Sequence, residues 1–150
     1  MDLHIFLEDH RHAVITEATQ LLGNRPLKNY TNSGENVNKE RLTKLFDLVS
    51  GSIKSKDLIP MMDYATEIAN QRFKQGFDLE EVIAAFNVME EVIWEKITRS
   101  INPVDYPQAF GMVSTVIGYG KEQLSVTYVA LASNRKHLVS LDMTGLFQGV

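Results

Sequence analysis

The sequence contains no cysteine and little histidine. Without cysteine there are no disulfide bonds, no thiolate metal sites and no cysteine nucleophile. Three of the four histidines, His4, His10 and His12, lie in the first twelve residues, but at helical spacing they point to different faces. No pair of histidines four residues apart shares a helical face with a carboxylate, so we expect no metal site.

Long apolar runs and clusters of basic residues are also missing. The best apolar stretch, residues 109–131, is interrupted by Lys121 and Glu122 and falls short of the ~20 apolar residues that a membrane span needs. The acidic N-terminus lacks the basic start and apolar core of a signal peptide. The net charge of −4, without a clustered basic face, argues against nucleic-acid binding. We therefore predict a cytoplasmic protein with no membrane span.

Patterns typical of β-strands and of catalytic sites are absent as well. There is no nucleophile elbow and no phosphate-binding glycine loop. Gly118-Tyr119-Gly120 lies inside an apparent helix with no strand before it, which is not the setting of a nucleotide-binding motif. We therefore predict no catalytic residue and no cofactor, and we expect a protein that is not an enzyme.

What the chain does contain is apolar residues at helical spacing. Its 150 residues are enough for one domain that buries roughly two-thirds of the surface of the unfolded chain. We predict an all-α bundle of about five helices, globin-like or up-down, over residues 1–137 and a tail over residues 138–150, with one short helix at Met143–Phe147. Residues 24–36, rich in Asn, Ser, Gly and Pro, are expected to form a loop. The expected helices are Asp2–Leu22, Val37–Ser50 (ended by Gly51), Leu58–Gln75, Leu79–Arg99 and Gln108–Lys136.

The strongest local signals surround Gly76. This glycine suits the position after the end of a helix, and Asp78 with Glu81 three residues later has the spacing of a capping box. Phe77 and Val82 are spaced as a hydrophobic staple. So short a turn predicts that the third and fourth helices form a tight antiparallel hairpin.

Arg72 and Glu90 are charged residues on the apolar faces of these two helices. Arg72 has two interpretations: an ion pair with Glu81 that closes the hairpin, or a contact to an anion or ligand. Glu90 is expected opposite Asp63 and Tyr64. It is either an acid perturbed by burial, or a residue that bonds to Tyr64 or faces solvent at the edge of the stripe.

His10 lies on the apolar face of the first helix. It is either a pH sensor, a metal or haem ligand, or a core histidine whose hydrogen bonds are satisfied. A small apolar or acidic ligand held near His10, Tyr64 and Glu90 is the alternative to a purely protein-binding role. Haem is disfavoured, because the second, third and fourth helices contain no histidine.

Two features favour a homodimer. The fourth helix has apolar residues beyond a single stripe, with Trp94 assigned to the core, which is typical of a helix that is central or shared with a partner. The last helix carries a line of small residues, which permit close approach of another backbone; Gly118 and Gly120 also weaken it locally. The small residues are Gly111, Ser114, Thr115, Gly118, Ser125 and Ala132.

Residues 64–97 resemble the amino-terminal domain family of the RsbT co-antagonist RsbRD. The resemblance rests on Arg72-Phe73, Gly76-Phe77, Asp78 and Ile93-Trp94, and the opening LHIFLEDHRHAVI and the later KERLTKLFDLV are also similar. It implies a helical module related to the haem-free, globin-like input domains of stressosome-type regulators and of sensor histidine kinases. Such modules receive a signal or dock a partner, often as dimers. The sequence ends at Val150 without an output domain, so we expect either a stand-alone version or an excised front piece.

Overall fold

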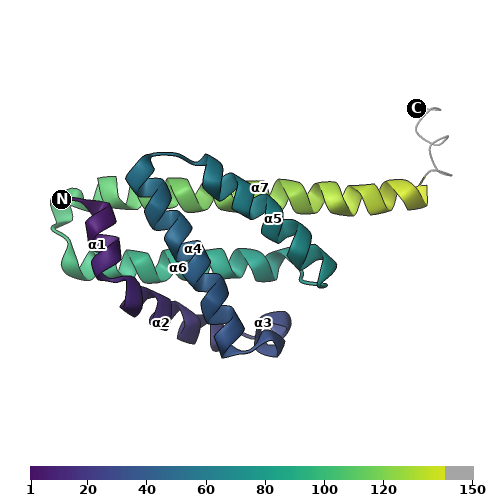
Figure 1. Ribbon diagram of the computed structural model, residues 1–150, viewed down its shortest axis with the longest axis horizontal. Helices are drawn as coiled ribbons and strands as arrows, with labels where there is room; N and C mark the ends of the chain where they lie inside the picture. The colour runs from purple at the N-terminus through teal and green to yellow at the C-terminus, as the bar shows by residue number, and fades with distance from the viewer. Residues whose placement is uncertain (141–150) are drawn as a thin grey trace.

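The computed structural model describes residues 1–140, and every regular element in them is helical. The all-α prediction is confirmed. The expected helix at Met143–Phe147 lies outside the described residues. In chain order the elements are α1 (Leu3–Asp9), α2 (Arg11–Gly23), α3 (Lys28–Ser33), α4 (Glu35–Ser55), α5 (Ile59–Lys74), α6 (Leu79–Ser100), the 3₁₀ helix η1 (Pro103–Asp105) and α7 (Tyr106–Ser140) (Figure 1).

The expected first helix is broken at His10. Asp2 caps α1 by accepting a hydrogen bond from the backbone N–H of Ile5 at 3.2 Å. At His10 the backbone leaves helical geometry, with φ −102° and ψ 7°, and the ring Nδ1 bonds to the carbonyl oxygen of Phe6 at 2.8 Å. The break gives α1 and α2 different directions, so that α1 packs on α4 while α2 contacts both α4 and α6. The prediction of one continuous helix was wrong here.

The expected loop before the second helix contains a helix of its own. α3 covers six of its residues, and Gly34, at φ 86°, turns the chain into α4. The expected end of the helix at Gly51 was wrong: α4 continues to Ser55, because Ser52 and Ile53 are buried beyond Gly51, and Lys56 supplies the left-handed end at φ 55°. Composition alone predicted this segment poorly, since a short helix stabilised by contacts with other helices has little local signal.

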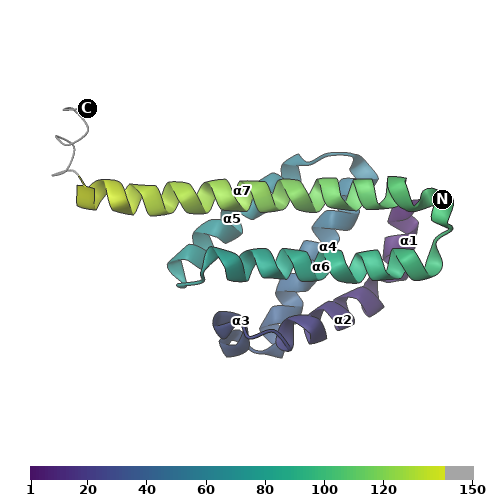
Figure 2. The same ribbon diagram turned by 180° about the vertical axis from the view of Figure 1, so that it is seen from behind.

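The turn around Gly76 has its predicted caps. Gly76 adopts φ 85°, and the Asp78–Glu81 capping box is present, with the Asp78 N–H donating to Glu81 Oε1 at 3.2 Å. The tight hairpin is not confirmed. α5 packs most extensively on α7, which also lies along α6 (Figure 2). The globin-like or up-down arrangement of about five helices is likewise not confirmed, since the described residues form seven α-helices.

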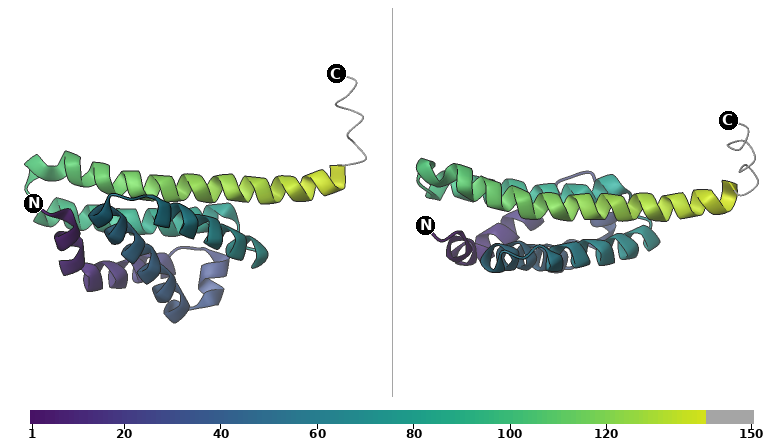
Figure 3. Two further views of the ribbon diagram at one scale, coloured as in Figure 1. Left: turned by 45° about the horizontal axis from the view of Figure 1, so that its top comes forward. Right: turned by 90° about the horizontal axis from the view of Figure 1, so that it is seen from above.

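α7 is the longest element and organises the rest. It runs the length of the molecule and extends beyond the other helices toward the C-terminus (Figure 3). It also runs past the expected end at Lys136 to Ser140. A methyl group at Gly120 would lie 2.7 Å from Phe86 Cε2 and 3.0 Å from Met61 Sδ, so Gly120 lets α7 approach both α5 and α6. Trp94, expected in the core, is instead 40% exposed, with its ring 5.4 Å from that of Phe110.

Candidate functional site

Two arginines from different helices meet over the ring of Phe77. The guanidinium carbon of Arg41, on α4, lies 5.3 Å from the ring centroid, and that of Arg72, on α5, lies 5.6 Å from it. Tyr30, from α3, packs edge-on against Phe77 at 5.1 Å. Both cations are thus within reach of the electron-rich face of one aromatic ring. The Gly76-Phe77 turn thus positions that ring against side chains from α3, α4 and α5.

Arg72 is buried without a carboxylate partner. It is 6% exposed, and its Nε has no hydrogen-bond partner. Among the described residues, neither Arg72 nor Arg41 forms an ion pair, and Arg41 donates to Ser33 Oγ at 2.9 Å. Burial of an uncompensated charge is costly, so this arrangement requires an explanation.

The expected Arg72–Glu81 ion pair is replaced by a contact between α6 and α3. Glu81 accepts hydrogen bonds from the Asn29 amide Nδ2 at 2.7 Å and from its backbone N–H at 2.9 Å. Burial opposes ionisation of Glu81, but the bonds from Asn29 and from the Asp78 backbone hold its pKa below the usual value. The charge of Glu81 is therefore used to fix α3 against the turn.

The electrostatics of the cluster reflect burial and like charge. Burial, followed by the charge of Arg72, lowers the pKa of Arg41. Burial raises the pKa of Tyr64 to about 12, although the charge of Arg72 opposes the shift. Burial also raises the pKa of Tyr30, again opposed by Arg72. Near neutral pH the cluster therefore consists of two cations and neutral phenols.

A groove between α4 and α5 opens onto the two arginines. Its volume is about 330 Å³, and a second cavity of about 20 Å³ lies inside, against Tyr30, Tyr64 and both arginines. The groove brings together Arg72 and Tyr64, two of the sequence-predicted candidates. It is lined by Val37, Glu40, Arg41, Lys44, Tyr64, Glu67, Ile68, Gln71, Arg72 and Gln75.

The other two candidates lie elsewhere. Glu90 bonds to neither Asp63 nor Tyr64 but faces α7, with Oε1 3.9 Å from Lys121 Nζ. Burial raises its pKa, opposed by Lys121 and by a hydrogen bond with Ser114. His10 is half-buried at the α1–α2 break, where its ring packs 4.2 Å from that of Phe6. The structure therefore divides the expected ligand site of His10, Tyr64 and Glu90.

Sequence reasoning missed Arg41 and Tyr30. Arg41 is only half-buried and directly follows the exposed Lys39 and Glu40, and Tyr30 falls in a segment whose composition indicated a loop. The available signal was that Arg72 and Phe77 belong to one short motif at the end of α5. Their partners come from 31 and 47 residues away in the chain, respectively, so no local pattern identifies them.

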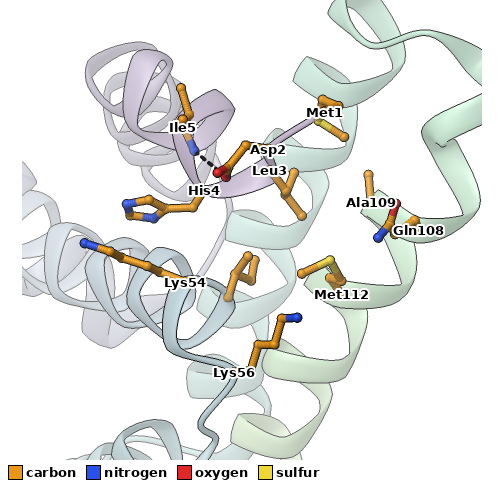
Figure 4. Close-up of a pocket in the computed structure, with 11 residues that line it drawn as sticks. Met1, Asp2, Leu3, His4, Ile5, Lys54, Lys56, Gln108, Ala109 and Met112 are labelled. Carbon is orange, nitrogen blue, oxygen red and sulfur yellow. Dashed lines mark hydrogen bonds between the residues drawn. The ribbon is translucent and has the colours of Figure 1, made fainter.

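A larger groove lies where the N-terminus meets α4 and α7 (Figure 4). Its volume is about 760 Å³, and the side chains of Lys54 and Lys56 extend beside it. Its other polar groups serve the fold: Asp2 caps α1, and His4 Nδ1 bonds to Ser50 Oγ at 3.0 Å. No buried unpartnered polar atom lies in its lining, so the arginine groove is the stronger candidate.

Within residues 1–140 no helix combines the length and apolarity that a membrane crossing requires. The described residues also hold no cluster of three or more side chains suited to a metal ion.

Comparison with known proteins identifies a family for this chain. A family model described as the RsbT co-antagonist protein rsbRD N-terminal domain matches residues 36–141, which is more than half of the chain. This range includes Arg41, Arg72, the Gly76-Phe77 turn and all the described residues of α7. No curated protein and no solved structure matches the chain.

Proposed function

This chain belongs to the family of RsbT co-antagonist protein rsbRD N-terminal domains, and we propose that it is a non-enzymatic signalling input domain of the stressosome type. The domain would act in the cytoplasm through contacts with a downstream signalling protein or domain. Family membership supports the signalling role. The Ser50 hydroxyl lies 3.0 Å from His4 Nδ1, but it donates to Glu8 Oε1 at 2.8 Å and is fully buried, so this pair gives no support to a catalytic role.

The outer face of α7 supports a homodimer. Six exposed residues follow one another at alternating spacings of four and three: Thr115, Tyr119, Glu122, Val126, Val129 and Ser133. Tyr119, Val126 and Val129 are 45%, 58% and 61% exposed, and only Glu122 carries a charge. Alternation of four and three is the spacing by which two helices pack along a common seam. A second copy of α7 is the partner that matches this spacing.

A dimer through α7 would allow a structural change in the bundle to reach a downstream partner. α7 contacts α4, α5 and α6, and it extends beyond them toward the C-terminus. A shift of α7 of one to two ångströms or so, of the kind seen at other helical interfaces, would carry a change in the bundle to whatever the dimer presents.

Sedimentation equilibrium on the purified chain tests this proposal. We expect a dimer at micromolar concentration, because a paired helical seam of this length resembles a short coiled coil. A chain that remains monomeric at high micromolar concentration would contradict the dimer and with it the proposed route.

A second candidate is a ligand-binding sensor. The observation that favours it is the buried, unpartnered Nε of Arg72 at the groove between α4 and α5. The site of such a sensor would be centred on Arg72 and Tyr64, without His10 or Glu90.

A further inference from the structure

We propose that the groove between α4 and α5 binds a small oxyanion, a phosphate or carboxylate group, held between the guanidinium groups of Arg41 and Arg72. The proposal names the ligand class of the sensor candidate. Its role in signalling rests on the proposed function, whereas the binding itself does not.

The groove holds uncompensated positive charge. Arg41 and Arg72 line the same groove and lie over the same ring, yet the described residues supply no ion pair to either. Two like charges in a partly desolvated site repel each other, and the burial of Arg72 adds a cost of desolvation. An anion between them turns the repulsion into attraction and offsets the cost of burying Arg72. Arginine is well suited to this task, because its planar donors match the geometry of phosphate and carboxylate.

The partners already present do not suffice. The Tyr30 hydroxyl forms a hydrogen bond with the Arg72 side chain, but a neutral phenol leaves the charge of Arg72 uncompensated. The ring of Phe77 attracts both cations, but cation–π contacts are worth only about 0.5–2 kcal/mol. The internal cavity of about 20 Å³ is large enough for one water molecule, which would satisfy Nε of Arg72. Water leaves the net charge of the pair unchanged, so the pair still lacks an anion.

The lining of the groove limits the size and charge of the ligand. Lys44 and the two arginines face the groove together with Glu40 and Glu67, which gives three cationic and two anionic side chains. Glu67 accepts a hydrogen bond from Gln71 Nε2 at 3.2 Å. Because these carboxylates offset the field at the mouth, the site favours a compact anionic group over an extended polyanion.

Occupancy of this groove would be transmitted to α7 through Phe77. Arg41 and Arg72 contact the Phe77 ring, and the Tyr128 hydroxyl of α7 donates to the Phe77 carbonyl oxygen at 3.3 Å. Phe73, on α5, also packs edge-on against Tyr128 at 5.7 Å. The anion site and the outer face of α7 are therefore connected through one turn and one tyrosine.

Titration of the ¹⁵N-labelled chain with inorganic phosphate, and separately with succinate, tests the binding by NMR at constant ionic strength in sodium chloride. We expect saturable shifts of the Arg41 and Arg72 Nε–Hε signals. A response to phosphate alone identifies a phosphoryl group, and a response to both identifies oxyanions in general. The proposal is overturned by no saturable shift up to about 50 mM of either anion, or by saturation that leaves both arginine signals unmoved.

Three variants assign the binding to the pair. Arg41→Met and Arg72→Lys should each weaken phosphate binding at least tenfold, the latter because lysine keeps the charge but loses the planar donors. Arg99→Met removes the same charge from an exposed arginine outside the groove and should leave the affinity unchanged. If Arg72→Lys fails to fold by circular dichroism, Arg41→Met, at a half-exposed position, decides alone. Unchanged affinity in the folded arginine variants would overturn the proposal.

Sedimentation with and without phosphate separates the two proposals. A dimer that is insensitive to phosphate would remove the signalling role of the anion and leave the binding result standing. A monomer that binds phosphate through both arginines would contradict the dimer alone.

Discussion

Phe77 is the residue on which most of the site depends. Its backbone follows Gly76 at φ 85°, its carbonyl accepts from Tyr128, and its ring lies under two guanidinium groups. The nearby Glu81 also has two structural roles, because its carboxylate completes the capping box and accepts a hydrogen bond from Asn29. Charged side chains in this region therefore serve either the turn or the groove, and the two roles are separable by mutation.

Glu81→Ala should lower the free energy of unfolding by about 1–2 kcal/mol, because it removes a cap and the bonds to Asn29. The wild-type contribution should be present above the ordinary pKa of glutamate and be lost as the pH falls through the depressed pKa of Glu81. Urea unfolding between pH 7 and pH 3 measures both effects. Glu80→Ala, at an exposed position of the same helical turn, is the control and should change stability by less than about 0.5 kcal/mol.

Glu90→Gln should leave stability at pH 7 unchanged within about 1 kcal/mol or raise it, because burial disfavours the carboxylate and Lys121 is a distant partner at 3.9 Å. The pKa of Glu90 is raised in the fold, so the wild-type residue favours folding below the ordinary pKa of glutamate. That contribution is lost as the pH rises through the raised value. The stability difference between wild type and variant should therefore favour the wild type more at pH 4 than at pH 7. A loss of more than about 2 kcal/mol at pH 7 would mean that the carboxylate is strongly paired.

At the scale of elements, α5 and α6 pack mainly against α7, whereas the sequence predicted that they pack against each other as a hairpin. α7 lies against α5 and α6 together, and of the three glycines at 111, 118 and 120 only Gly120 has side chains of the neighbouring helices within reach of an added methyl group. α3, though only six residues long, supplies Tyr30 to the site, and Asn29 in the same helix binds Glu81. The short helix α3 thus contributes residues to a site whose walls are formed by the long helices α4 and α5.

Gly120→Ala should destabilise the protein by about 1–3 kcal/mol, because the new methyl group meets the buried Phe86 ring and Met61. Gly118→Ala is the matched control. Nothing lies within 4 Å of a methyl group there, so the better helix propensity of alanine should stabilise α7 by up to about 1 kcal/mol. Urea denaturation of both variants measures the difference, and a Gly120→Ala protein as stable as Gly118→Ala would contradict the close approach.

For the whole molecule, the helical bundle and the exposed seam of α7, the outer-face residues Thr115, Tyr119, Glu122, Val126, Val129 and Ser133, have separate roles. The buried core joins residues from all seven α-helices, so the bundle is one packed body in the described part of the chain. The seam contributes nothing to that core, because its side chains face away from α5 and α6. Changes on the seam should therefore alter association while leaving the fold intact.

Val126→Glu should shift the chain toward monomer without loss of helical content, because it places a charge in the middle of the seam. Val104→Glu makes the same substitution at a valine that is 78% exposed in η1, away from the seam, and should remain dimeric. Sedimentation velocity at matched concentrations distinguishes the two. Equal association of both variants would place the interface elsewhere.

The sequence by itself determined the features that depend on neighbouring residues. The helical class, Gly76 as a turn residue, and the Asp78–Glu81 capping box follow from backbone geometry and hydrogen bonds that span only a few positions. The family resemblance rested on the same local motif, and the match over residues 36–141 agrees with it.

Only the tertiary structure decided the partners of the charged residues. One of the two interpretations of Arg72 paired it with Glu81, nine positions away, but Arg72 meets Arg41 from another helix, and Glu81 meets Asn29. Glu90 faces α7 instead of α5. His10 lies at the end of α1, although the apolar periodicity of the sequence predicted that the helix continues through it. The physical reason is common to all of them. Periodicity fixes which face of a helix is apolar, but the helix that covers that face is selected by packing across the whole chain.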